Sequence, residues 1–133
     1  MLKFVVMDTN AISRNLLASV LANGGHEVIG EFNTTPASIA TMVKLQPQVV
    51  CIDIGDADGD GLGKLDLIRA ELPKALLFMV SGQFAAEAVQ AGAARGVHGF
   101  IVKPFKSATV LTTIRNAIIK IARRHKEGAE QDS

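Results

Sequence analysis

The sequence predicts an α/β fold in which five βα units, written (βα)5, form a doubly wound, five-stranded parallel sheet. Short apolar runs alternate along the chain with segments of helical period. The apolar runs lack the polar alternation of half-exposed strands, which is typical of parallel strands buried on both faces. The length of 133 residues suits one domain. Because crossovers between parallel strands are right-handed, helices are expected on both faces of the sheet.

Each expected strand is a short run of residues that a sheet core would bury. The five runs are residues 4–7, 28–29, 49–52, 76–80 and 100–102. In a doubly wound sheet the first and third strands are neighbours, and ligands bind beyond the carboxyl ends of the strands. The residues that directly follow the strands are therefore the first candidates for function.

The five expected helices follow the strands, and their ends carry recognisable signals. Asn23-Gly24-Gly25 stops the first helix, Thr35 caps the second with Pro36 in its first turn, Pro73 halts the third, and Ser107 caps the fifth. The fourth, over residues 85–95, is rich in alanine. The apolar residues at helical spacing are Ile12, Leu16, Leu17, Val20 and Leu21 in the first helix, Ile39, Met42 and Val43 in the second, Leu62, Leu65, Ile68 and Leu72 in the third, and Leu111, Ile114, Ile118 and Ile121 in the fifth.

Composition and charge narrow the range of partners. The 14 Lys and Arg residues against 13 Asp and Glu give a net charge of +1, which predicts no direct binding to nucleic acid or membrane. The longest apolar run, residues 75–80, is far too short to cross a bilayer. One cysteine, Cys51, cannot form an internal disulfide, so a cytoplasmic location is expected. Residues 125–133 are polar and are expected to form a disordered tail after a domain of residues 1–124.

Four polar side chains are expected to converge at the carboxyl edge of the sheet. Asp8 and Asp53 directly follow the first and third strands, Ser81 follows the fourth and Lys103 follows the fifth. Two neighbouring carboxylates repel each other unless a cation neutralises them, and a hard divalent ion with oxygen ligands is the usual solution. Each residue taken alone could simply open a loop or cap a helix, so the prediction depends on the set.

These residues resemble the receiver domain of response regulators, the CheY-like family of two-component signalling with a flavodoxin-like fold. The similar segments are Asp8 to Arg14, Asp53 with Asp60-Gly61-Leu62, Val80-Ser81-Gly82, and Gly99 to Phe105 with its Lys103-Pro104 pair. The resemblance covers residues 2 to about 124. It implies that Asp53 accepts a phosphoryl group, that Asp8 belongs to an acidic pocket, that Lys103 assists catalysis, and that Ser81 and Phe100 form the switch.

The implied chemistry is phosphoryl transfer to an aspartate. Asp53 supplies the oxygen nucleophile, and Mg²⁺ held by Asp53, Asp8 and the backbone carbonyl of Gly55 neutralises charge. Lys103 and the Ser81 hydroxyl contact the phosphoryl oxygens. The resemblance implies a stand-alone response regulator, a phospho-acceptor rather than an enzyme, that catalyses its own phosphorylation and dephosphorylation. Its partners are a sensor histidine kinase or phosphotransfer protein and a protein output target.

The chain also departs from the family pattern. Thr9 stands where a second acid usually follows the first, which predicts weakened Mg²⁺ binding. Asp56-Ala57 replaces the usual Met-Pro pair after the phospho-acceptor, and the switch hydroxyl is Ser81 in place of the common threonine. The main alternative is therefore a degenerate receiver that acts as a phosphorylation-independent interaction module.

Other hypotheses have less support in the sequence. Asp56, Asp58, Asp60 and Gly61 match the start of an EF-hand calcium loop, but its twelfth position is Leu67 and its ninth is Lys64. A flavodoxin-like cofactor binder would need a glycine-rich phosphate loop after the first strand. Cys51 is expected to be a buried apolar group, and the basic end of the last helix a solvated terminus.

Overall fold

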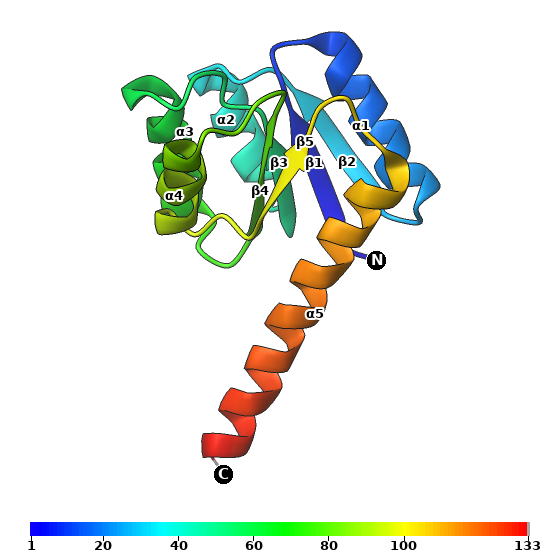
Figure 1. Cartoon of the computed structure of the whole chain (residues 1–133), viewed down its shortest axis with the longest axis vertical. Helices are drawn as coiled ribbons and strands as arrows, with labels where there is room; N and C mark the ends of the chain where they lie inside the picture. The colour runs from blue at the N-terminus through cyan, green and yellow to red at the C-terminus, as the bar shows by residue number, and fades with distance from the viewer. Residues whose placement is uncertain (133) are drawn as a thin grey trace.

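The computed structural model describes residues 1–132 and has the predicted (βα)5 architecture (Figure 1). The strands are β1 (Lys3–Met7), β2 (Glu27–Phe32), β3 (Val49–Ile52), β4 (Leu76–Ser81) and β5 (Gly99–Val102). The helices are α1 (Ala11–Asn23), α2 (Pro36–Lys44), α3 (Gly59–Glu71), α4 (Ala86–Ala94) and α5 (Ser107–Asp132). All five strands are parallel in the order β2-β1-β3-β4-β5, so β1 and β3 are neighbours as predicted.

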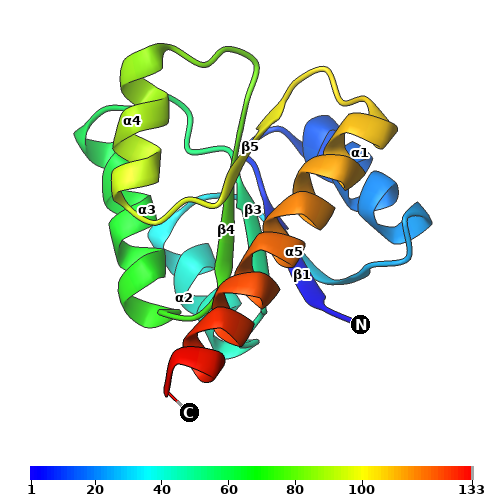
Figure 2. The same cartoon turned by 60° about the horizontal axis from the view of Figure 1, so that its bottom comes forward.

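The sheet lies between two helical layers. Helices α1 and α5 cover one face, and α2, α3 and α4 cover the other, as the two views show (Figures 1 and 2). Alternate residues of each strand point to opposite faces. Phe4 and Val6 of β1 therefore join the core under α1 and α5, whereas Val5 and Met7 join the core under α2 and α3. This double burial explains why β1, β3 and β4 read as continuous apolar runs, whereas the edge strands β2 and β5 are only partly buried.

The helix caps follow the sequence signals. The Thr35 side chain accepts a hydrogen bond from the Ser38 amide at the start of α2, with Pro36 in the first turn. Gly24 caps α1, and Gly25 follows with a φ of 89°, a left-handed conformation that glycine adopts without strain.

The first helix differs from the prediction in its exposed face. Leu17 and Leu21 are buried, but Ile12 is 79% exposed and Leu16 is 49% exposed. Both exposed residues fit the helical spacing. The apolar stripe on α1 is therefore wider than the part of the helix that the sheet covers.

The last helix is longer than the core requires. Val110, Ile114 and Ala117 are buried against the sheet, and beyond them α5 projects past the amino-terminal ends of the strands (Figure 1). The helix includes residues 125–132 of the segment expected to be a disordered tail, and Ser133 lies outside the described residues. Within residues 1–132, no helix combines the length and the apolar character that a membrane crossing needs.

Candidate functional site

Main-chain hydrogen bonds tie the carboxyl ends of the strands together just beyond their ladders. They run from the Asp8 amide to the Phe32 carbonyl at 3.0 Å, from the Asp53 amide to the Met7 carbonyl at 3.0 Å, and from the Lys103 amide to the Ser81 carbonyl at 2.8 Å. The backbone under each predicted site residue is therefore fixed by its neighbouring strand. A rigid base of this kind suits a site that must hold charges close together.

Lys103 joins the two aspartates. Its Nζ atom lies 2.7 Å from Oδ2 of Asp8 and 2.7 Å from Oδ2 of Asp53, two charge-assisted hydrogen bonds to a single ammonium. The side chains of Asp8, Asp53 and Lys103 are 6%, 17% and 22% exposed. Burial lowers the pKa of Lys103, but the hydrogen bonds to Asp53 and Asp8 and their charges outweigh burial, so the pKa is raised. The structure thus brings together three of the four predicted polar groups.

Two residues that the sequence reasoning did not select support Asp8. The Asn10 amide donates to Oδ1 of Asp8 at 2.9 Å, and the Asn10 side chain caps α1 by accepting from the Ser13 amide. Arg14, one helical turn later, donates from its guanidinium to the Asp8 carbonyl at 2.9 Å. The N-cap residue at position 10 was the available signal, because it places residue 14 back over the end of β1.

The free face of Asp53 is shaped by the loop that follows it. The Gly55 amide donates to Oδ1 of Asp53 at 2.8 Å, and Gly55 has a φ of 77°, which a residue with a Cβ rarely adopts. The two carboxylates present hard oxygen donors to one point, now occupied by the ammonium, so the donor set of Asp8 and Asp53 fits a divalent cation. Thr9 is exposed and uncharged, and no group of three His, Cys, Asp or Glu side chains able to hold a metal occurs among the described residues.

Ser81 lies at the same sheet edge, but its hydroxyl bonds within its own loop. It donates to the Gln83 carbonyl at 2.9 Å and accepts from the Gln83 amide at 3.1 Å. The hydroxyl therefore closes a turn in this structure, and the four groups predicted to converge do so only as three. Strand position places Ser81 near the site, but the direction of a hydroxyl depends on its local backbone, which the sequence pattern does not show.

Phe100 packs toward α4. Its ring meets Phe84 edge to face, with ring centroids 5.2 Å apart, and Phe84 belongs to the loop that carries Ser81. A Cβ at Gly92 of α4 would lie 2.5 Å from the Met79 sulfur and 3.3 Å from the Phe100 ring. The glycine therefore makes room for the aromatic ring beside the helix.

The Asp- and Gly-rich segment after β3 forms the beginning of α3. Asp58 is the N-cap, accepting from the Gly61 amide at 3.0 Å, and Asp60 lies in the first turn. A Cβ at Gly61 would lie 2.1 Å from the Asp56 carbonyl oxygen, so the helix rests directly on the loop backbone. The residues that match the start of an EF-hand loop thus include the first turn of a helix.

Cys51 and the histidines occupy other places. Cys51 is fully buried in β3, and burial raises the pKa of its thiol to about 12, which keeps it an unreactive apolar group. Burial lowers the pKa of His26, which stacks against Phe4 with ring centroids 4.6 Å apart. The His98 ring accepts from the Leu77 amide at 3.1 Å at the start of β5, far from the aspartates along both strands. The side chain of His125 lies outside the described part of the chain.

A doubly wound sheet with two aspartates and a lysine at the carboxyl ends of β1, β3 and β5 defines a class of signalling domain. The profile of the response regulator receiver domain matches residues 4–115. The chain therefore belongs to the receiver domain family of response regulators, as its sequence motifs implied. Receiver domains generally bind Mg²⁺ at their phosphorylation site, interact with histidine kinases or phosphotransfer proteins, and are generally not enzymes.

Individual relatives agree with this assignment. The chain is 28% identical over 117 residues to the chemotaxis protein CheY of Listeria monocytogenes, covering 88% of this chain and 98% of that protein. It is 29% identical to CheY of Bacillus subtilis, covering 87% and 97%. Among solved structures, NtrX from Brucella abortus has a TM-score of 0.83 at 27% identity over 98% of this chain and 30% of that one. CheY4 of Vibrio cholerae, at 24% identity, shares the fold with a TM-score of 0.76 over 88% of this chain and 98% of that one.

Proposed function

We propose that this receiver accepts a phosphoryl group on Asp53 from the phosphohistidine of a sensor kinase or phosphotransfer protein. The observation that carries the proposal is the Lys103 ammonium, 2.7 Å from both Asp53 and Asp8. A carboxylate oxygen of Asp53 attacks phosphorus, the bond from phosphorus to the histidine nitrogen breaks, and the electron pair stays on the imidazole. The product is an acyl phosphate on Asp53, whose oxygens the ammonium can contact without moving far.

Metal binding in this proposal uses the same two carboxylates. Asp8, Asp53 and the Gly55 carbonyl hold the ion, which when bound supplies a positive charge to the phosphoryl oxygens. Thr9 offers no charge, so the affinity for Mg²⁺ is lower than a site with a third carboxylate would have. Asp8 keeps its orientation through the Asn10 amide, and its backbone is held by Arg14.

Ser81 and Phe100 supply the read-out. The Ser81 hydroxyl exchanges its two hydrogen bonds to Gln83 for one to the phosphoryl group, which releases the turn in the β4–α4 loop. Phe84, on this loop, then shifts against Phe100, and the surface of α4, β5 and α5 changes. The phosphoryl group favours the second arrangement only by its differential contacts with Ser81 and Lys103.

A protein phosphodonor has an apolar surface beside the site to dock on. Ile12 and Leu16 lie one turn apart on α1, which begins three residues after Asp8, and both are exposed. Apolar residues at this spacing form a continuous ridge that a helix of a partner can cover. The output target is a second protein, since the read-out alters surface shape.

The second candidate is a degenerate receiver that binds its partner without phosphorylation. Thr9 favours it, because a neutral residue there removes a metal ligand, and because the ammonium of Lys103 already satisfies both remaining carboxylates. In this case the surface of α4, β5 and α5 would be constitutively in one arrangement.

Labelling with a phosphodonor separates these candidates. The protein is incubated with Mg²⁺ and acetyl phosphate and examined by intact-mass spectrometry. We expect one added phosphoryl group in the wild type, none in Asp53→Asn, and full labelling in Asp56→Asn, a matched change of an exposed aspartate three residues on. No labelling of the wild type supports the degenerate receiver, and labelling of Asp53→Asn contradicts the proposed acceptor.

A metal titration tests the role of position 9. Thr9→Asp adds a hard, charged ligand, and one charge pair near a surface contributes about 1 to 4 kcal/mol. We therefore expect Mg²⁺ to bind the variant at least about fivefold more tightly than the wild type, measured by isothermal calorimetry. Equal affinities would show that residue 9 does not face the cation.

A further inference from the structure

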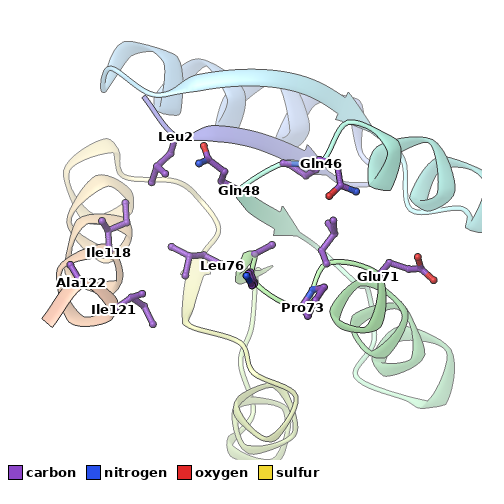
Figure 3. A pocket seen from close by; sticks show the side chains of 13 residues that line it. Leu2, Gln46, Gln48, Glu71, Pro73, Leu76, Ile118, Ile121 and Ala122 are labelled. Carbon is purple, nitrogen blue, oxygen red and sulfur yellow. The ribbon is translucent and has the colours of Figure 1, made fainter. Parts of the chain in front are cut away.

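A groove lies at the opposite end of the sheet from the aspartates. It has a volume of about 590 Å³ and is open to solvent. Figure 3 shows Ile118 and Ile121 of α5 on one side, Pro73 on the other, and Leu2 and Leu76, at the starts of β1 and β4, in between. The groove lies where α5 continues past the sheet (Figure 1). Ile118 is partly buried there against the core cluster on which Leu2 and Leu76 also pack, and Ile121, also partly buried, lies one turn further along.

A second hollow continues this groove toward β5. It has a volume of about 450 Å³ and shares Lys74, Leu76 and Ile121 with the first. Its other walls include Arg69 and His98. The apolar groove therefore has a basic side, and both are parts of one surface, which we call the basal groove.

Arg69, on the basic side of the groove, makes its hydrogen bonds with main-chain carbonyls. Arg69 donates to the carbonyls of Leu72, Pro73, Ala75 and Gly96 at 2.9 to 3.2 Å, so its hydrogen bonds are satisfied but its charge is not. Burial lowers the pKa of Arg69; burial, and after it the positive charges of Arg69 and Arg124, lower that of His98.

Further positively charged side chains lie beside the basal groove. Lys74 is exposed in the wall of the groove. Arg124 is exposed on α5 three residues after Ile121, and its positive charge acts on His98 of the same wall. In the described part of the chain, the ion pairs are Arg95 with Asp66 and Lys103 with its two aspartates. Among the described residues that line the basal groove, Glu71 is the acidic one.

We propose that the basal groove binds an amphipathic helix of a partner protein that carries Asp and Glu beside its apolar face. The apolar floor takes the hydrophobic side chains at helical spacing, and the cations of Lys74 and Arg124 pair with the flanking carboxylates. An open groove suits a helix, because a small molecule would remain largely in water there. The concave shape also favours a helix over a flat lipid surface, since Ile118 and Ile121 face into the groove (Figure 3).

This site is independent of the phosphorylation proposed for Asp53, because it lies at the amino-terminal ends of the strands. The test therefore uses the unphosphorylated protein. The probe is a synthetic helical peptide with leucine at helical spacing and glutamate at its other positions, and the matched probe carries lysine in place of glutamate. Binding is followed by fluorescence anisotropy and by amide chemical shifts of the labelled protein.

We expect the glutamate peptide to bind saturably and to shift the amides of Leu2, Leu76 and Ile121. Reversing two exposed charges together, Lys74→Glu with Arg124→Glu, should weaken binding at least tenfold, as should 1 M salt. Arg115→Glu, a single charge reversal on α5 outside the groove, should leave the affinity within a factor of two. All three side chains are exposed, and retained amide spectra establish that the variants fold.

Four results would overturn the proposal. The lysine peptide could bind as tightly as the glutamate peptide, or the shifts could map to α4 and β5. Vesicles containing phosphatidylserine could shift the same amides when neither peptide does, which would assign the surface to membranes. Sedimentation could instead show a dimer that the double charge reversal dissociates, which would assign the groove to a second copy of the chain.

Discussion

Replacing Lys103 with methionine tests whether the ammonium holds the site together. Methionine keeps an unbranched apolar stem but has no charge, so Asp8 and Asp53 would face each other with only their amide donors, Asn10 and Gly55. Their side chains are 6% and 17% exposed, so water can only partly replace the lost hydrogen bonds. Removing one partner of such a pair leaves charge without compensation.

The size of the effect follows from the geometry. Both Oδ2 atoms lie 2.7 Å from Nζ, so they are separated by at most twice that distance. Two like charges about 5 Å apart repel by about 3 kcal/mol at an effective dielectric constant of about 20. Hydrogen bonds to charged groups contribute about 1.5 to 3 kcal/mol each, partly offset by the cost of burying the ammonium. We expect Lys103→Met to lower the free energy of unfolding by about 3 kcal/mol.

Urea unfolding followed by circular dichroism measures this loss. With a slope of about 1.5 kcal/mol per molar urea, the midpoint should fall by about 2 M. Mg²⁺ should restore more stability to the variant than to the wild type, since it neutralises the same two carboxylates; at 100 times the dissociation constant it contributes about 2.7 kcal/mol. Lys106→Met, a change of an exposed lysine, is the control. A loss under 1 kcal/mol, or equal Mg²⁺ effects on both proteins, would refute the reasoning.

Two further predictions concern stability. Gly61→Ala should lose about 1 to 3 kcal/mol of unfolding free energy, because its Cβ would lie 2.1 Å from the Asp56 carbonyl, whereas Gly63→Ala, with open space on the same helix, should lose none; equal midpoints in urea for the two variants would contradict this. The raised pKa of Lys103 means that its contribution is complete below the ordinary lysine pKa of about 10.4 and is lost as pH rises through the higher folded value. Wild-type stability should therefore drop in that alkaline range more steeply than the stability of Lys103→Met, and parallel curves would argue against it.

The fold could be predicted because its signals are local and agree with one another. The apolar runs mark the strands, of which β1, β3 and β4 are buried on both faces. Thr35 and Gly24 cap the helices they were expected to cap. The meeting of Asp8 and Asp53 followed from strand order alone, since residues that end neighbouring parallel strands share an edge. Neither inference requires knowledge of any side-chain rotamer.

The sequence could not predict in which direction some side chains point or how far α5 extends beyond the core. Helical spacing gave the period of α1 but not which of its apolar residues the sheet would cover, so the exposure of Ile12 and Leu16 came from the structure. The Ser81 hydroxyl can satisfy its own loop or reach across the sheet edge, and both are compatible with the same sequence. The projection of α5 beyond the core leaves Ile118 and Ile121 only partly buried in the wall of an open groove, which no strand or helix signal indicates.

In the function proposed for this site, Thr9 determines how strongly the site depends on metal. A carboxylate at this position would add a third negative charge beside Asp8 and Asp53, more than the single ammonium of Lys103 can balance, and a divalent cation would then be needed to relieve the repulsion. With threonine, two carboxylates and one ammonium leave one net negative charge, and two hydrogen bonds of 2.7 Å already hold the pair. The phosphoryl group adds further negative charge to the site, and it is this added charge that the metal ion would neutralise. Mg²⁺ should therefore change the rate of phosphorylation at Asp53 far more than it changes the stability of the unmodified protein.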